Sequence, residues 1–183
     1  MTEIAVRSLA TADLRDAELR ELRALLDLAF NDPEERFSDD DWQHAMGGVH
    51  FLAEREGRIV SHASVVGREL HVAGRPLSTG YVEAVATDPA WQGQGFGSAV
   101  MRAVNGHLAD AGYELGALGT GSQGFYERLG WFVWRGPSSV RRAGGEQPTP
   151  EEDGYIMALR TPATPPLDPE APISCDWRPG DVW

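Results

Sequence analysis

The order of hydrophobic and polar residues predicts a chain of short strands interrupted by helices. Alternating or short apolar runs predict strands at residues 4–8, 50–54, 58–70, 78–87, 115–118, 131–134 and 155–159. Apolar residues at helical spacing predict helices over residues 11–30 and 96–111, and shorter helices after Ser38 and around Tyr126. This order predicts an α+β fold with a mixed, mostly antiparallel β-sheet flanked by helices.

Two other stretches lack such a pattern. Residues 135–153 are rich in glycine, proline and charge, which predicts a long loop. From Thr161 onward prolines interrupt the chain, so we expect no regular structure in the tail. A length of 183 residues allows one sizeable core, and we expect a single domain over residues 1–183.

The charge balance narrows the class of partner. The 28 acidic residues exceed the 16 basic ones, all of which are arginine, and give a formal net charge of −12. This excess argues against nucleic acid or an anionic membrane as a partner and favours a cationic one. A single cysteine, Cys175, and the lack of any run that approaches a membrane span indicate a cytoplasmic protein.

Acidic residues are concentrated at residues 32–41, where six of ten positions are aspartate or glutamate. Ser38 followed by Asp41 resembles a capping box, which predicts a helix start with carboxylates facing water. The alternative is a wall of negative charge for a polycationic substrate. The histidines show no metal-ligand spacing, so we expect no metal and structural roles for His44, His50, His62, His71 and His107.

Residues 80–97, GYVEAVATDPAWQGQGFG, join a strand to a glycine-rich turn and the start of a helix. Backbone N–H groups in such a turn point into one concavity, and the helix dipole adds partial positive charge there. Glycine leaves the backbone open to close approach by a phosphate. The stretch therefore predicts a pyrophosphate site beside a strand that carries one carboxylate, Glu83.

Two motifs resemble the GNAT acetyltransferase superfamily: Q-x-x-G-x-G at residues 92–97 and F-Y-x-x-x-G-W at residues 125–131. The resemblance implies a GNAT-type sheet and acetyl-CoA as co-substrate. It also implies that the coenzyme is bound by Val85, Ala86, Thr87, Gln92, Gly93, Gln94, Gly95, Phe96, Gly97 and Ser98.

The same resemblance assigns roles to two side chains. Glu83 would remove a proton from the acceptor, directly or through a water, because an ammonium group cannot attack a thioester. Tyr126 would protonate the leaving thiolate, and the amide near Val85 would bind the thioester carbonyl. The alternatives are a strand carboxylate paired with arginine and a tyrosine hydrogen-bonded in the core. Cys175 is a poor candidate nucleophile, because no histidine lies near it in the motif pattern.

A narrower resemblance, to the aminoglycoside 2'-N-acetyltransferases of mycobacteria, runs from about residue 8 to the terminus. It rests on M-G-G-x-H at residues 46–50, L-G-A-L at 115–118 and above all C-D-W-R-x-G-D-V-W at 175–183. The chain departs from this family at Gly119, where the family has serine, and at Glu152, where it has aspartate. The resemblance implies aminoglycoside contacts at Asp32 or Glu35, Asp41, Glu83, Gly119, Glu152, Asp153, Asp181 and the Trp183 α-carboxylate.

The sequence therefore predicts an acetyl-CoA-dependent N-acetyltransferase that acts on the 2'-amine of aminoglycosides in a ternary complex. We expect the tail, residues 161–183, to be ordered and to close on the substrate site. The alternatives are a GNAT enzyme for another polyamine, peptide or metabolite amine, and a coenzyme A- or drug-binding module without turnover. The resemblance further implies a possible homodimer and a part in antibiotic resistance.

Overall fold

The computed structural model describes residues 4–31 and 37–183. Two compact units make up the chain: the first holds Met1–Val66 with Val82–Gly106, and the second holds Gly67–Tyr81 with His107–Trp183. Three elements contribute residues to both units, namely strands β3 (Arg58–Val72) and β4 (Arg75–Thr87) and helix α3 (Phe96–Asp110).

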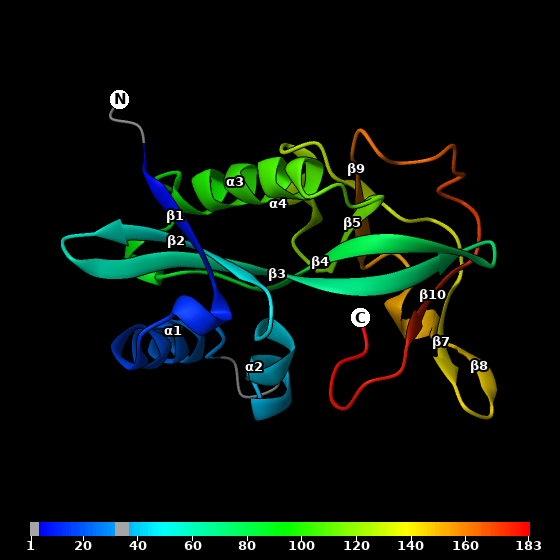
Figure 1. The fold of residues 1–183 in the computed structure, drawn as a ribbon, viewed down its shortest axis with the longest axis horizontal. Helices are drawn as coiled ribbons and strands as arrows, with labels where there is room; N and C mark the ends of the chain where they lie inside the picture. Colours follow the sequence, from blue (N-terminus) through cyan, green and yellow to red (C-terminus); the bar gives the residue numbers. More distant parts are fainter. Residues whose placement is uncertain (1–3, 32–36) are drawn as a thin grey trace. The chain divides into compact units, whose positions relative to one another are not determined.

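The first unit consists of strands covered by helices. Its other elements are β1 (Val6–Ala10), a 3-10 turn (Thr11–Asp13), α1 (Asp16–Ala29), α2 (Asp39–Ala45) and β2 (Val49–Arg55). β2 pairs antiparallel with both β1 and β3. Helices α1 and α2 lie on one face of these strands and α3 lies on the other (Figure 1). β2 and β3 form a hairpin, in which Glu56 and Gly57 of the turn have φ of 53° and 74°.

The apolar face of α1 forms the core of the first unit. Leu22, Leu25 and Leu26 are buried there against Leu52 and Ile59 of the strands. Burying a side chain of this size stabilises the fold by about 1.5–3 kcal/mol. The same cluster takes in the end of β4, so α1 also supports the strand that carries the candidate base.

The long helices agree with their predicted positions except at one end. The helix predicted over residues 11–30 begins at Asp16, because Thr11–Asp13 form a 3-10 turn and Leu14 is extended. The helix predicted over residues 96–111 is α3. In the described ranges no helix is long and apolar enough to cross a membrane.

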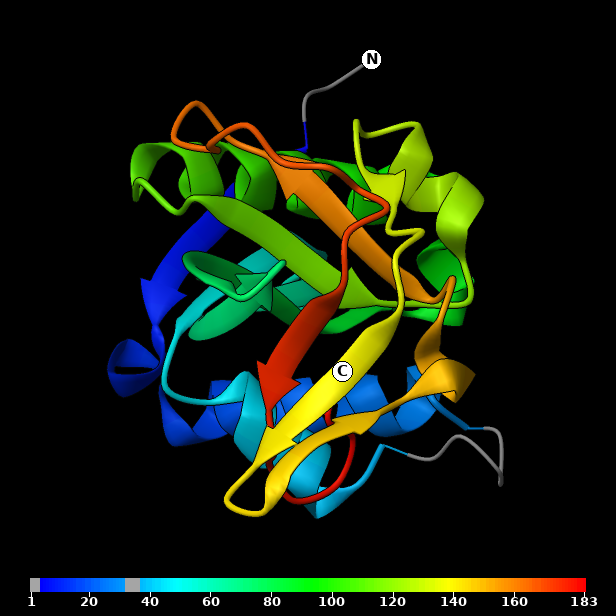
Figure 2. The ribbon, with the colours of Figure 1, turned by 90° about the vertical axis from the view of Figure 1, so that its right-hand side faces the viewer.

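The second unit is a mixed sheet with one short helix, α4 (Gln123–Glu127). Its strand order is β6 (Phe132–Val133), β9 (Ile156–Arg160), β5 (Leu115–Gly119), β4, β3, β10 (Ile173–Asp176), β7 (Ser138–Arg142) and β8 (Gly145–Pro148). β4 with β5 and β7 with β10 are parallel pairs, while β5–β9, β6–β9, β3–β10 and β7–β8 are antiparallel. Figure 2 shows β10 (red) and β7 (yellow) side by side. The predicted mixed, mostly antiparallel sheet is confirmed.

Two predictions about the C-terminal third of the chain are wrong. The loop predicted over residues 135–153 contains β7 and β8, and the tail predicted to lack regular structure contains β10. Ile173 of β10 pairs with Val72 of β3 on one side and with Ser138 of β7 on the other. A four-residue strand in a proline-rich tail has no periodicity of its own, so only these distant partners define it.

Candidate active site

The part of β4 that carries Glu83 departs from regular strand geometry. Ala84 has a φ of 52°, in the left-handed region that residues other than glycine rarely adopt. Such a residue within a strand is typical of a β-bulge, which changes the direction of the neighbouring side chains. Glu83 and Val85, on either side of it, are both half-buried. A left-handed Ala84 therefore turns the backbone between the candidate base, Glu83, and the candidate carbonyl-binding amide, that of Val85.

Side chains of β3 bind this part of β4 through its backbone carbonyls. The carbonyls of Glu83, Ala84 and Ala86 accept hydrogen bonds from Ser64 Oγ at 3.3 Å, His62 Nδ1 at 2.8 Å and Ser61 Oγ at 3.0 Å, respectively. Each bond of this kind contributes about 0.5–1.5 kcal/mol net. Together they hold the backbone around the candidate base on one path.

The glycine-rich turn follows β4 directly. Asp88 caps the 3-10 turn Pro89–Trp91 by accepting a backbone N–H at 2.9 Å. Gly93 and Gly95 then have φ of 72° and 92° on either side of Gln94. Alternation of left-handed and ordinary backbone conformations turns successive N–H groups toward one concavity, which is the geometry of an anion-binding nest.

Helix α3 begins immediately behind this turn, at Phe96. Its first N–H groups have no partner within the helix and carry the positive end of the helix dipole. The Phe96 side chain is buried, and its ring meets the Trp91 ring edge-on with centroids 5.8 Å apart. A Cβ atom placed at Gly93 would meet no described atom within 4 Å, so this side of the turn is open. Residues 92–98 therefore fit a pyrophosphate in charge and in access.

In the second unit Tyr126 lies in α4 and is only 6% exposed. The rings of Phe125 and Trp131 pack edge-on against its ring, with centroids 4.9 and 6.2 Å away. Burial raises the pKa of the Tyr126 phenol well above its ordinary value. The hydroxyl therefore keeps its proton at neutral pH and can act as a hydrogen-bond or proton donor.

In the second unit the carboxylates of Glu151, Glu152 and Asp181 are close enough to interact. Burial, and then the negative charges of Asp181 and Glu151, raise the pKa of Glu152. A cation placed among these groups would relieve that repulsion. Asp153 has a structural contact instead, because its Oδ1 accepts hydrogen bonds from Ser138 N at 2.8 Å and from Ser138 Oγ at 2.7 Å.

The last residue of the chain, Trp183, is buried within the second unit and is 4% exposed. Its indole donates to Thr149 Oγ1 at 3.1 Å, and Arg68 Nη2 donates to the preceding carbonyl, Val182 O, at 2.9 Å. A Cβ atom at Gly119 would lie 3.3 Å from the backbone carbonyl carbon of Trp183. Glycine at this position therefore leaves space for the backbone carbonyl group of Trp183.

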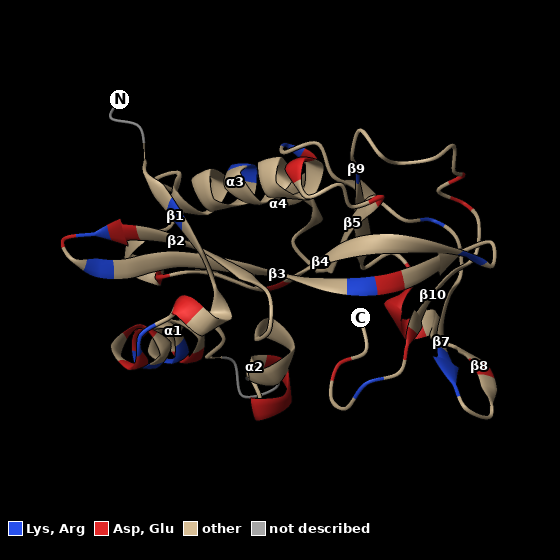
Figure 3. Cartoon of the chain, in the orientation of Figure 1, with Lys and Arg blue, Asp and Glu red and all other residues tan. Residues whose placement is uncertain are grey.

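Asp41 is the third residue of α2 and forms a capping box with Ser38, the N-cap residue. Its Oδ2 accepts hydrogen bonds from Ser38 N at 2.8 Å and Ser38 Oγ at 2.7 Å, so the predicted capping box is confirmed. Figure 3 shows the acidic residues gathered at this end of the helix. The other acids predicted to contact a substrate in this segment, Asp32 and Glu35, lie outside the described residues.

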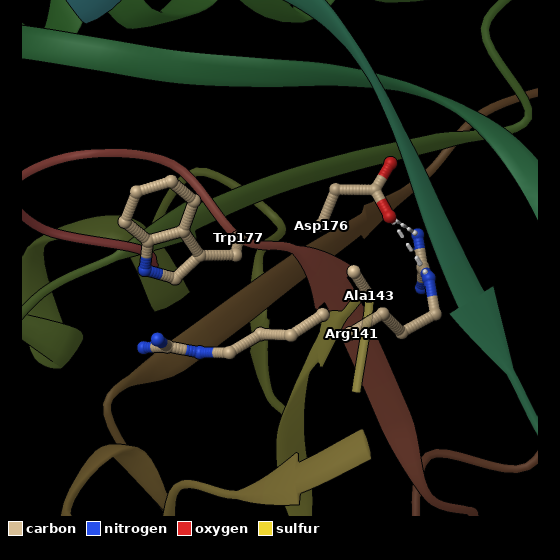
Figure 4. A pocket seen from close by; sticks show the side chains of 5 residues that line it. Arg141, Ala143, Asp176 and Trp177 are labelled. Carbon is tan, nitrogen blue, oxygen red and sulfur yellow. Dashed lines mark hydrogen bonds and ion pairs between the residues drawn. The ribbon is translucent and has the colours of Figure 1, made fainter. Parts of the chain in front are cut away.

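An open hollow of about 530 Å³ lies beside β7 and β10 in the second unit. Arg141, Arg142, Ala143, Asp176 and Trp177 line it (Figure 4). Arg141 pairs with Asp176 at 3.0 Å, and the Arg142 guanidinium lies 5.3 Å from the centre of the Trp177 ring. Two arginines against one aspartate give the hollow a net positive lining, which suits an anion better than a polycation.

Sequence reasoning missed the residues that hold these groups in place. Arg68 donates to Asp176 O at 3.2 Å as well as to the end of the tail, and His62 binds the bulged carbonyl of β4. No local pattern points to either residue, because their partners lie 22 to 114 positions away in the chain. Among the residues that the structure describes, no group of three histidines, cysteines or carboxylates is arranged to hold a metal ion.

Comparison with known proteins connects this geometry to a chemistry. A family model described as "Acetyltransferase (GNAT) domain" matches residues 11–133. An aminoglycoside 2'-N-acetyltransferase of Mycolicibacterium fortuitum is 44% identical over 182 residues, which cover 97% of this chain and 91% of the relative.

Solved structures of low sequence identity share the fold. A GNAT family acetyltransferase from Brucella melitensis, in complex with acetyl-CoA, superposes with a TM-score of 0.62 at 19% identity and covers 92% of this chain and 94% of its own. A GNAT family N-acetyltransferase from Escherichia coli, in complex with CoA, gives a TM-score of 0.62 at 16% identity and covers 94% of this chain and 89% of its own.

Proposed function

The chain belongs to the GNAT acetyltransferase family, and we propose that it transfers the acetyl group of acetyl-CoA to the 2'-amine of aminoglycosides. The observation that carries the proposal is the 44% identity, over 97% of the chain, to an aminoglycoside 2'-N-acetyltransferase. The shared fold alone would not choose a substrate, because one fold serves many reactions.

Acetyl-CoA is the co-substrate in this proposal. The N–H groups of residues 92–98 would bind its pyrophosphate, and the open face at Gly93 supports that assignment. Val85, Ala86 and Thr87 would pair with the pantetheine arm as if it were an added strand. The chain would thus present the thioester beside the bulged part of β4.

The chemistry requires a proton to leave the acceptor and another to reach the leaving group. Glu83 would take a proton from the acceptor ammonium, after which the amine nitrogen bonds to the thioester carbonyl carbon. The Val85 N–H would donate to the carbonyl oxygen while negative charge develops there. As the carbon–sulfur bond breaks, Tyr126 would protonate the thiolate, and the second proton released by the acceptor nitrogen would restore the phenol. Burial raises the pKa of Tyr126, so the phenol carries the proton that this role needs.

A polycationic acceptor is supported by the carboxylates of the second unit. Burial, and then repulsion from Asp181, raises the pKa of Glu152, and a bound ammonium group would offset the repulsion. We propose further aminoglycoside contacts for the remaining predicted residues: Asp32 or Glu35, Asp41, Gly119, Asp153 and the Trp183 carboxylate. In this proposal residues 1–183 act as one domain, with the tail from residue 161 contributing to the acceptor site.

Release of free thiol from acetyl-CoA over a panel of aminoglycosides tests the proposal. We expect turnover with tobramycin, which carries a 2'-amine, and none with amikacin, which carries a 2'-hydroxyl. Equal rates on the two drugs would refute the assignment of the 2' position. Turnover with spermine but with neither drug would point to another polyamine as the acceptor.

Two further measurements test the oligomeric state and the domain organisation. Light scattering on the purified chain tests the homodimer that the family resemblance implies. A single cooperative unfolding transition in urea would support one domain, whereas two separated transitions would contradict it.

A further inference from the structure

Two buried histidines of the first unit form a hydrogen-bonded chain that ends on the bulged part of β4. Thr11 Oγ1 lies 2.8 Å from His50 Nε2, and His50 Nδ1 lies 2.9 Å from His62 Nε2. His62 Nδ1 in turn lies 2.8 Å from Ala84 O. Both histidines are 0% exposed, and their rings stack with centroids 5.2 Å apart.

The carbonyl at one end fixes the order of protons along this chain. Ala84 O can only accept, so His62 must carry its proton on Nδ1. Neutral His62 then accepts at Nε2, which requires His50 to donate from Nδ1 and to accept at Nε2 from the Thr11 hydroxyl. Gly47 N donates to Thr11 Oγ1 at 2.9 Å and holds the hydroxyl in place.

Both histidines are neutral near pH 7. Burial lowers the pKa of His50 to about 4, and burial together with the neighbouring His50 lowers the pKa of His62 to about 3. A charged His62 would turn an Nε2–H toward the Nδ1–H of His50, so protonation breaks the chain. The pair is therefore a fixed donor aimed at one carbonyl, and it serves no acid–base step.

The carbonyl that receives this bond belongs to the strained residue of β4. Ala84 has a φ of 52°, a conformation in which an alanine side chain crowds its own backbone. Strained residues persist only where the surrounding structure holds them. The methyl group of Ala84 packs on the core cluster under α1, and its carbonyl is bound by His62.

We propose that His50 and His62 are positioning residues for acetyl transfer. Their hydrogen-bonded chain holds Ala84 in the left-handed conformation and so fixes the directions of Glu83 and Val85. The inference rests on the proposed function, since that function gives Glu83 and the Val85 amide their roles. His62 acts through Ala84, and His50 acts by fixing the tautomer of His62.

Nitrogen NMR of the histidine-labelled protein tests the proton order without any substrate. We expect both rings to be neutral and protonated on Nδ1 at pH 7.5. A signal from His62 protonated on Nε2 would overturn the inference, because that tautomer cannot donate to Ala84 O.

A matched pair of substitutions tests the two hydrogen bonds of His62 separately. The amide of His62→Asn occupies the place of Nδ1 and can still donate to Ala84 O, whereas that of His62→Gln occupies the place of Nε2 and can contact only His50. Both replacements are polar and do not titrate. We expect His62→Asn to keep kcat/KM within about threefold of wild type and His62→Gln to lower it at least tenfold, the cost of one lost buried hydrogen bond at a strained residue.

Rescue by glycine distinguishes positioning from core packing. Glycine adopts a positive φ without strain, so Ala84→Gly should supply the left-handed conformation that the His62 hydrogen bond otherwise enforces. In the Ala84→Gly background, kcat/KM of the His62→Asn variant should exceed that of the His62→Gln variant by less than about threefold. Equal rates for the Asn and Gln variants, or an unchanged ratio in the glycine background, would overturn the inference.

The readouts also separate this inference from the proposed function. If the wild-type chain acetylates no aminoglycoside, the proposed function fails. The same variants are then compared by their affinity for acetyl-CoA and by the backbone NMR signals of Glu83 and Val85, which need no acceptor. Displaced signals and weaker binding in His62→Gln alone would support the positioning role, and identical behaviour of both variants would refute it.

Discussion

The buried histidine pair makes the stability of this protein depend on pH between 7.5 and 5.5. His50 and His62 have folded-state pKa values of about 4 and about 3, below the ordinary value of 6.5, because burial disfavours their charged forms. In the unfolded chain both titrate near 6.5, so acid favours unfolding. Their contribution to stability is therefore fully present above pH 6.5 and is lost as the pH falls toward the folded-state values.

The size of the effect follows from the distance below the unfolded pKa. At pH 5.5 each histidine lies one unit below 6.5 and still above its folded-state value, so each loses about 1.4 kcal/mol of stability. The pair together loses about 3 kcal/mol, a large part of a typical folding free energy. The result requires that both folded-state values lie well below 5.5.

Urea unfolding at pH 7.5 and 5.5, followed by tryptophan fluorescence and circular dichroism, measures this loss. Both values stay above the isoelectric point of about 4.7, where solubility is lowest. The control is His50→Gln with His62→Asn, which carries the same other titrating groups. We expect the wild type to lose about 3 kcal/mol more than the control between the two pH values. Equal losses would refute the claim that these histidines are buried and neutral.

Three further predictions concern the proposed reaction. Glu83→Gln should lower kcat by about a hundredfold at pH 6 and by much less at pH 9, where the amine loses its proton unaided, so a uniform loss across the pH–rate profile would argue against Glu83 as base. Tyr126→Phe should lower kcat at least tenfold, and the wild-type profile should show no loss from this phenol below pH 10, because burial raises its pKa. Asp181→Asn should raise the aminoglycoside KM severalfold and leave the acetyl-CoA KM unchanged. It should also lower the pKa of Glu152, as measured by carbon NMR. A changed KM for acetyl-CoA would argue against a role of Asp181 at the acceptor site.

Local features of the fold were predictable from the sequence. The capping box at Ser38, the turn at Gly57 and helix α3 all follow from residues within a few positions of one another. Strands β7 and β10 were not predictable, since Ser138 and Ile173 pair across 35 positions of chain. Such pairings are chosen by the whole sheet, so a short polar strand has no signature of its own.

The candidate site likewise has some features that the sequence predicts and others that it does not. The glycine-rich turn was predictable because its glycines and the start of the following helix are neighbours in the sequence. The anchors of the tail were not, because Arg68 meets Val182 only after β3 and the C-terminus have folded together within the second unit. The burial of Trp183 was not predictable either, because the proline-rich tail has no hydrophobic periodicity that would indicate it.

The order of residues is enough to assign the class of chemistry, because an anion-binding turn, a helix start and a carboxylate on the preceding strand are neighbours along the chain. The folded protein defines the surroundings of that carboxylate. It places Ala84 in a left-handed conformation and brings His62 from another strand to its carbonyl. Neither feature is local, since strain at one residue persists only where contacts from distant residues stabilise it.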